Sequence, residues 1–420
     1  MRISASLTDE NFIWNSIGGM LNALQSVVAL MVITRVCGIE AAGIYSISYA
    51  MGNLFLYLGN YGVRNYQVSD LQERYSFSDY LYHRMFTTIL MLAAAALYTA
   101  INFCLGSYSL YKAGCVMAMG VLKAAECLSE VFEGRYQQRG RLDCSGKLQS
   151  FRLFFSIGGM MIVLVVTGDL LTALWCAVLF SLLASVILVA HFRSVASYQR
   201  KMLSTDRISG LMRECFPVCA SNFLTVFVIN EPKYVMDAMM DETSQACYGF
   251  ISMPVFVIQL MTMFIYQPML VRMTLSYVND DRKAFLCSFR RVTLALLVIS
   301  VPVILAAWFL GIPVLSVMYA TNLSAYKEAF MILMLGGIFL AFNGFCTVVL
   351  TVMRLQSRGL AVYLIGSVIS MLVTTYMTGS LGIYGACLSF LIVMMAITVM
   401  MAVTISVHCT NENFSRRNGK

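Results

Sequence analysis

The chain has 420 residues, of which 59% are hydrophobic and 12% are charged, and its mean hydropathy is +0.76. Soluble domains are about 45–50% apolar and about 25% charged, so this chain has too little polar surface to coat a water-soluble fold. The composition therefore excludes cytosolic enzymes, nucleic-acid-binding proteins and secreted scaffolds, and it predicts a protein whose solvent is lipid.

Twelve segments are apolar and long enough to cross a membrane as helices. A spanning helix needs about 20 mostly apolar residues to cross about 30 Å of hydrocarbon. In chain order, the predicted spans cover residues 12–34, 43–63, 85–105, 113–132, 148–167, 170–190, 218–240, 245–270, 292–310, 329–352, 361–378 and 381–403. The fourth span is the weakest prediction, because Lys123, Glu126 and Glu130 lie within it.

The positive residues predict how these spans are oriented. With the N-terminus inside the cell, 25 of the 29 lysines and arginines fall on the cytoplasmic side, which is the usual bias of cytoplasmic loops. We therefore expect both termini in the cytoplasm. The net charge of +8 is then a topology signal, and no nucleic-acid partner is expected. The polar start of the chain, Met1 to Glu10, lacks the features of a cleaved signal peptide, so we expect it to be retained.

Short sequence matches recur in the two halves of the chain. Six spans per half give both halves the same orientation, which permits a parallel internal repeat. The matched pairs are residues 135–140 with 354–359 (R-x-Q-x-R-G), 167–170 with 378–381 (T-G-x-L) and 63–64 with 271–272 (V-R). We predict an all-α polytopic membrane protein of twelve transmembrane helices, in two six-helix lobes related by a parallel pseudo-repeat, with residues 1–206 as the N-terminal lobe and 207–420 as the C-terminal lobe.

Amide side chains follow one stripe of the first span. Asn15, Asn22 and Gln25 continue the stripe that begins at Asn11, because their spacing keeps them on one side of a helix. Polar groups at membrane depth are expensive, so we interpret the stripe as the wall of a water-filled cavity. The alternative is hydrogen bonding between packed helices.

The seventh span contains a charged stretch interrupted by Pro232. Broken helices at membrane depth occur where they line cavities, and Lys233 and Asn222 share a helix face there. Lys233 is therefore a candidate for binding a phosphate or carboxylate in the lumen. The alternative is an internal ion pair of Lys233 with Glu231 or Asp237 near the outer interface.

Three arginines are further candidates. Arg64 and Arg272 end the second and eighth spans and would form a symmetric anion clamp at the inner mouth if both point inward. The alternative, which we favour, is that they are ordinary positive flanks of the cytoplasmic loops. Arg35 lies at the outer end of the first span, where cations are rare, and Glu40 is its alternative partner.

On the fourth span, Glu126 and Glu130 belong to a polar stripe that would suit proton or sodium coupling. We favour the alternative that this end of the helix leaves the bilayer and is solvated. The sequence has no clustered metal ligands, no nucleotide-binding loop and no catalytic triad, so we expect neither an enzyme nor a cofactor.

Several of these patterns together resemble one family. R-x-x-G-x(4)-G-x-Y begins at Arg35, and N-x-P-K-Y, which contains Lys233, follows in the seventh span. R-x-Q-x-R ends the tenth span at residues 354–358, and G-x-x-G-A opens the twelfth at Gly382. The chain resembles, over essentially its whole length, the polysaccharide (Wzx-like, O-antigen or lipopolysaccharide) flippases of the multidrug/oligosaccharidyl-lipid/polysaccharide exporter superfamily.

The resemblance implies a multi-pass flippase of the bacterial or archaeal cytoplasmic (inner) membrane. Its substrate would be an isoprenoid-diphosphate-linked oligosaccharide for cell-surface polysaccharide, and its partners would be membrane lipids and other polysaccharide-assembly membrane proteins. Two alternatives are a cation-coupled exporter of small molecules and an O-antigen-type polymerase. The first would need a carboxylate inside the first span, which has none, and the second would need a large outer loop, whereas the predicted outer loops have about ten residues or fewer.

Overall fold

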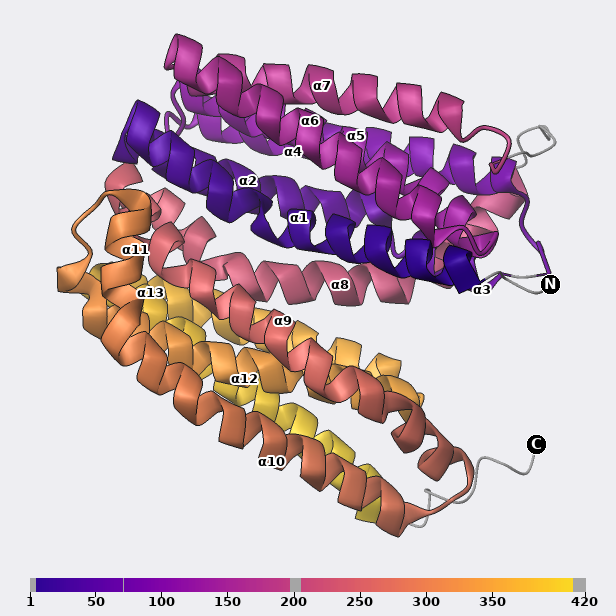
Figure 1. The fold of residues 1–420 in the computed structure, drawn as a ribbon. Coiled ribbons are helices and arrows are strands. Elements are labelled where there is room, and N and C mark those ends of the chain that lie inside the picture. Colours follow the sequence, from indigo (N-terminus) through magenta and orange to yellow (C-terminus); the bar gives the residue numbers. More distant parts are fainter. Residues whose placement is uncertain (1–4, 71, 197–204, 411–420) are drawn as a thin grey trace. The chain divides into compact units, whose positions relative to one another are not determined.

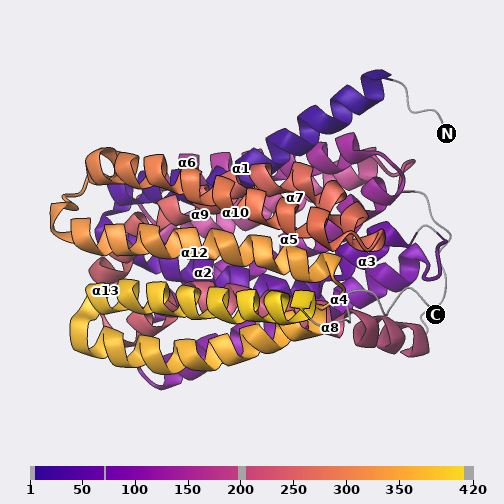
Figure 2. The ribbon, with the colours of Figure 1, turned by 90° about the horizontal axis from the view of Figure 1, so that it is seen from below.

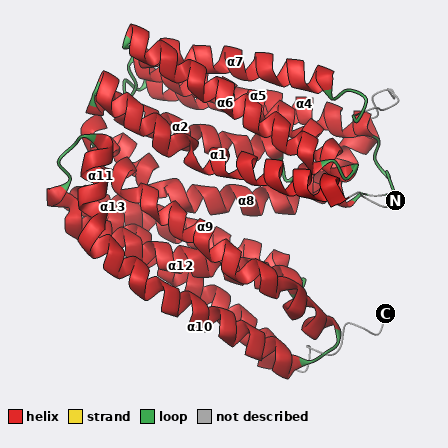
Figure 3. Cartoon of the chain, viewed as in Figure 1, coloured by secondary structure: helices red, strands yellow, loops and turns green. Residues whose placement is uncertain are grey.

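A computed structural model describes residues 5–70, 72–196 and 205–410. Within these ranges the chain consists of helices and connecting loops, with no strand (Figure 3). Part of the stretch between the sixth and seventh predicted spans lies outside the described residues. So do three of the basic residues counted on the cytoplasmic side, Arg416, Arg417 and Lys420.

The chain divides into two compact units, Met1–Val226 and Phe227–Lys420. The division falls inside helix α8 (Thr205–Met239), and the predicted boundary after residue 206 lies at the start of the same helix. The first unit also contains seven helices in the described part of the chain: α1 (Ala5–Cys37), α2 (Ile39–Asn60), α3 (Val63–Ser69), α4 (Phe77–Cys104), α5 (Leu110–Gln138), α6 (Leu142–Thr167) and α7 (Leu170–His191).

Helix α5 lies at the centre of the first unit. It packs against α2, α3, α4, α6 and α7, whereas α1 packs mainly against α6 and α2 (Figure 1). The connections are short and capped. Asp169 caps α7 directly after α6, and the hydrogen bonds it accepts from Thr172 hold the pKa of its carboxyl below its ordinary value. The central place of α5 determines that its polar stripe faces other helices.

The second unit continues from α8 with α9 (Glu242–Val278) and α10 (Arg282–Ala306), which runs through a π-helical turn, Ala307–Gly311, into α11 (Ile312–Tyr319). After a short 3-10 turn (Ser324–Tyr326), α12 (Lys327–Val352) packs against α9, α10 and α13 (Gln356–Thr410), as Figure 2 illustrates. Helix α13 is broken at Gly382, whose φ of 59° is open to glycine but strained for other residues. The break separates the eleventh and twelfth predicted spans.

Each of the twelve predicted spans falls on a helix. By length and composition alone, eight helical segments of the described residues qualify as spans, with α13 counted once and α2, α5 and α9 outside the set. The surface is apolar: large side chains such as Val166, Val317 and Tyr376 are exposed, while Arg84 and Lys123 are buried. Such an inverted distribution suits a protein surrounded by lipid.

Candidate functional site

A continuous set of charged side chains crosses the interior of the first unit. The spacing of three, four and three residues on α5 places four of them on one face. Basic side chains from α3, α4 and α6 meet this face, and we call the set the charge ladder. Its members are Arg64, Arg84, Lys123, Glu126, Glu130, Glu133 and Arg152.

In two parts of the charge ladder, which we call rungs, a single cation lies close to a single carboxylate. The Nη2 atom of Arg84 lies 2.9 Å from Oε2 of Glu130, and its Nη1 donates to the Gly59 carbonyl at 3.0 Å. The Nη1 atom of Arg64 lies 3.0 Å from Oε2 of Glu133. Each of these guanidinium groups therefore has a carboxylate within 3.0 Å. Nε and Nη2 of Arg84 and Oε2 of Glu130 nevertheless have no well-oriented hydrogen bond among the described residues.

The third rung has two cations for one carboxylate. The Nζ atom of Lys123 lies 3.0 Å from Oε2 of Glu126 and 4.8 Å from the centre of the Tyr49 ring. The Nη1 atom of Arg152 is 3.9 Å from the same Glu126 oxygen, and the buried Arg152 Nε has no hydrogen-bond partner among the described residues. The side chains of Lys123 and Arg152 are only 2% and 3% exposed. The ladder thus holds four basic groups against three acidic ones, and the excess lies at this rung.

The α5 stripe is more enclosed than the solvated helix end that the sequence favours. Glu133 is buried, and the side chains of Glu126 and Glu130 are 17% and 18% exposed. The reason is that Arg84 from α4 and Arg152 from α6 close over the stripe. Sequence reasoning missed both as site residues. For Arg152 a signal exists, because an arginine inside a predicted span, here the fifth, marks a functional candidate.

Lys233 lies inside the second unit, where the residue is 5% exposed. Its Nζ atom is 6.0 Å from the centre of the Phe256 ring. In the described part of the chain the Lys233 side chain has neither an ion pair nor a hydrogen bond, so the alternative pairing with Glu231 or Asp237 is absent. It borders a small cavity of about 10 Å³, which has room for about one water molecule. Asn230, Tyr248 and Ser252 add polar groups to a lining that is otherwise apolar.

The amides of the first span do not form one continuous wall. Gln25 donates to Asn22 at 2.8 Å, and both are half-buried, whereas Asn15 is exposed. Asn11 accepts a hydrogen bond from the backbone N–H of Asp143 at 2.7 Å, at the start of α6. Asn11 therefore contributes to packing between α1 and α6, and Asn22 and Gln25 remain the candidates for substrate contact.

The remaining predicted residues are dispersed. Asn222 is half-buried, and Arg35 and Arg272 are exposed. Arg64 is engaged by Glu133 in the charge ladder. Because Arg64 and Arg272 belong to different units, their anion clamp stays a prediction.

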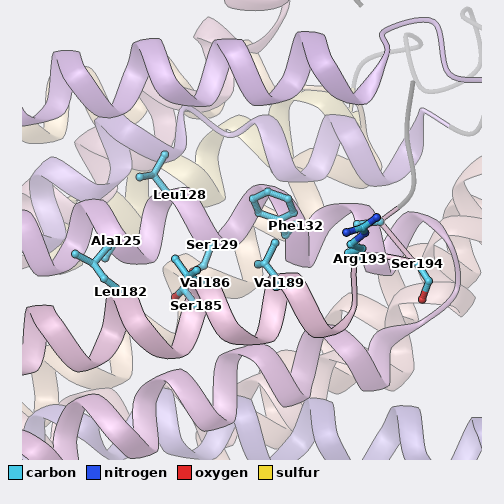
Figure 4. A pocket seen from close by; sticks show the side chains of 12 residues that line it. Ala125, Leu128, Ser129, Phe132, Leu182, Ser185, Val186, Val189, Arg193 and Ser194 are labelled. Carbon is cyan, nitrogen blue, oxygen red and sulfur yellow. The ribbon is translucent and has the colours of Figure 1, made fainter. Parts of the chain in front are cut away.

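A groove with a volume of about 940 Å³ lies between α5 and α7 of the first unit (Figure 4). Its lining is mostly apolar, with serine hydroxyls along it and Arg193 at one end, as Figure 4 shows. No pattern in the sequence indicates this groove. The lining residues are Ala125, Leu128, Ser129, Phe132, Leu182, Ser185, Val186, Val189, Ala190, Arg193, Ser194 and Ala196.

Comparison with known proteins places this arrangement in a family and a fold. Residues 9–274 match the model of the family described as "Polysaccharide biosynthesis protein". No curated protein matches the chain.

Solved structures with the same fold are very different in sequence. One is an inward-facing multidrug resistance MATE family transporter of the MOP superfamily, with a TM-score of 0.71 and 11% identity over 97% of this chain and 100% of that one. The lipid II flippase MurJ, inward closed, has a TM-score of 0.72 and 11% identity over 94% and 87%. A MATE transporter of Vibrio cholerae has a TM-score of 0.63 and 12% identity over 98% and 99%. The predicted all-α, two-lobed polytopic fold and the predicted superfamily are confirmed.

Proposed function

The chain belongs to the polysaccharide biosynthesis protein family, and on this premise we propose that it is a flippase for isoprenoid-diphosphate-linked oligosaccharides. It would move the head group from the cytoplasmic to the outer leaflet of the cytoplasmic membrane by alternating access. The substrate presents a diphosphate, sugar hydroxyls and a long apolar chain. A transporter for it therefore needs cations, amides and an apolar surface.

The observation that carries the proposal is the buried ammonium of Lys233 without a carboxylate partner in the described residues. Removing an ion from water costs several kcal/mol even after relaxation. A cation–π contact returns about 0.5–2 kcal/mol, which does not offset that cost. An anionic group of the substrate would compensate the charge. Because the cavity beside Lys233 has room for about one water molecule, the proposal requires the surrounding helices to separate during the transport cycle.

Two other features support the same substrate. Asn22 and Gln25 bring amide groups that can exchange hydrogen bonds with sugar hydroxyls. The groove between α5 and α7 offers a mostly apolar lining that suits an isoprenoid chain.

Complementation of a strain that lacks surface glycan for want of its flippase tests the proposal. We expect Lys233→Ala to abolish glycan display at wild-type protein level and Lys233→Arg to retain part of it. Lys327→Ala is the matched control, because Lys327 lies over the Trp308 ring at 4.3 Å and has no place in the proposed site. Normal display by the Lys233→Ala variant would contradict the role of this residue.

The chemistry of the first unit does not favour the alternative of a cation-coupled exporter. Glu126 and Glu130 are the predicted ion-coupling candidates, but each already lies within 3.0 Å of a basic side chain. Both carboxylates are therefore already engaged by cations of the protein, which leaves them less available to coordinate a coupling ion.

A further inference from the structure

The rung formed by Lys123, Glu126 and Arg152 is the only part of the described charge ladder in which cations outnumber carboxylates. Both cations approach the same oxygen, Oε2 of Glu126, at 3.0 Å and 3.9 Å. The longer distance exceeds a hydrogen bond. Arg152 thus has a carboxylate nearby without being bonded to it.

This arrangement is unfavourable for a purely structural ion pair. A buried guanidinium is normally satisfied by two parallel hydrogen bonds to a carboxylate, and Arg152 makes none to any described residue. The Tyr49 ring contacts only Lys123 in this rung, so it does not compensate Arg152. One further negative charge would neutralise the rung.

We infer that Lys123 and Arg152 form an anion-binding subsite inside the first unit, which takes a phosphate or diphosphate group, and that Glu126 is its internal counterion. The inference rests on the proposed function, because it assigns the subsite to the diphosphate of the transported lipid. Arg152 supplies the planar donors that match phosphate oxygens, and Lys123 supplies a point charge beside them.

The carboxylate is the accessible member of the rung. The Glu126 side chain is 17% exposed, whereas the two cations are almost fully buried. An arriving anion therefore meets the rung on the side of Glu126 and competes with it for the two cations. In the empty protein Glu126 offsets part of the cost of burying them.

Competition between Glu126 and the bound anion predicts a gain of affinity that a purely structural role of this rung does not predict. Neutralising Glu126 should strengthen anion binding, because a bound anion then no longer competes with a carboxylate for Lys123 and Arg152. We expect Glu126→Gln to bind farnesyl diphosphate about tenfold more tightly than the wild type. Arg152→Ala and Arg152→Gln should bind it about tenfold more weakly or worse. Glu73→Gln, whose carboxylate pairs with Arg135 and Arg139 outside the charge ladder, should leave the affinity within about twofold of the wild type.

The measurement is equilibrium binding to the full-length protein in lipid nanodiscs. Farnesyl diphosphate is the probe, inorganic pyrophosphate tests whether the phosphate group alone suffices, and farnesol tests whether the apolar chain alone suffices. Binding of both phosphate compounds, with none of farnesol, supports the subsite.

Unchanged affinity in both Glu126→Gln and Arg152→Gln would overturn the inference, as would a wild-type protein that binds no phosphate probe. Should Arg152→Ala fail to fold, the Glu126→Gln result decides, because a damaged protein does not gain affinity. Failure of the subsite is distinguishable from failure of the proposed function. In the first case Lys233→Ala still abolishes glycan display while the Arg152 variants retain it.

Discussion

Arg84 shows how a single cation organises the interior of the first unit. Its side chain is 0% exposed, and it bridges the Gly59 carbonyl, the Asn60 side chain and the Glu130 carboxylate. Two of these contacts are at the end of α2 and one is on α5. The residue thus joins three helices, counting its own, in a region where water cannot replace a missing partner.

We predict that Arg84→Met destabilises the protein by about 3–5 kcal/mol, because Glu130 would lose its closest counterion. Arg139→Ala is the control. Arg139 pairs with Glu73 at 3.5 Å where both side chains are about half exposed, so its loss should cost less than about 1 kcal/mol. Thermal unfolding followed by fluorescence-detected size exclusion would compare them. The double variant Arg84→Met with Glu130→Gln should recover part of the loss, and a double variant no better than the single one would contradict the argument.

The sequence predicts that charged residues lie within the fourth span, but not which partners they take. The stripe on α5 follows from its spacing, whereas Arg84 and Arg152 come from α4 and α6, whose rotation about their own axes a single sequence does not specify. The same limit applies to Lys233. Its place in an apolar span is readable, but its separation from Glu231 and Asp237 depends on the packing of the second unit.

At the scale of helices, α1 and α6 make an unusually close approach. A Cβ atom placed on Gly146 of α6 would lie 2.4 Å from the Trp14 carbonyl carbon of α1, and backbone atoms cannot move aside as a flexible side chain can. The contact is possible only because residue 146 has no side chain. The apolar sequences of α1 and α6 predict that both are spans, but they do not predict which residues of the two helices are in contact.

We expect Gly146→Ala to separate α1 from α6 and to destabilise the protein by about 1–3 kcal/mol, the usual range for overpacking. Gly158→Ala on the same helix is a matched control. Nothing lies within 4 Å of a Cβ atom at Gly158, and alanine favours a helix over glycine by about 1 kcal/mol. The two variants should therefore shift the melting temperature in opposite directions. Equal shifts would show that the close approach does not matter.

The groove between α5 and α7 permits a test with two neighbouring residues. Val186 lines the groove, whereas Ile187 does not, and they are 66% and 64% exposed. We predict that Val186→Trp fills the groove and slows transport of the lipid-linked substrate about tenfold, and that Ile187→Trp leaves the rate nearly unchanged. Transport into proteoliposomes of matched protein content gives the rates. Equal rates in the two variants would exclude the groove as the place of the isoprenoid chain.

At the scale of the whole molecule, the matched motifs of the two halves lie at equivalent connections between helices but at different positions relative to the helix ends. R-x-Q-x-R-G occurs at the connection of α5 with α6 and at that of α12 with α13, as the sequence predicts. The two copies nevertheless occupy different parts of that connection. The first begins within the last turn of α5, which ends at Gln138, and the second begins after α12 has ended at Val352. Left-handed backbone is found at Gly140 in one copy and at Arg354 in the other. Sequence identity between halves therefore located the equivalent loops but not the ends of the helices.

The orientation of the molecule in the membrane is predicted from charge alone and can be measured directly. With 25 of 29 basic residues predicted on one side, we expect green fluorescent protein fused after residue 420 to fluoresce, because it folds in the cytoplasm. Alkaline phosphatase inserted after Gly168, between α6 and α7, should be active, because that connection is predicted to face outward. Insertion after Gly140, between α5 and α6, is the matched control and should be inactive. A fluorescent C-terminus together with an inactive Gly168 insertion would place the C-terminus and residue 168 on the same side of the membrane. That result would contradict the twelve-span topology.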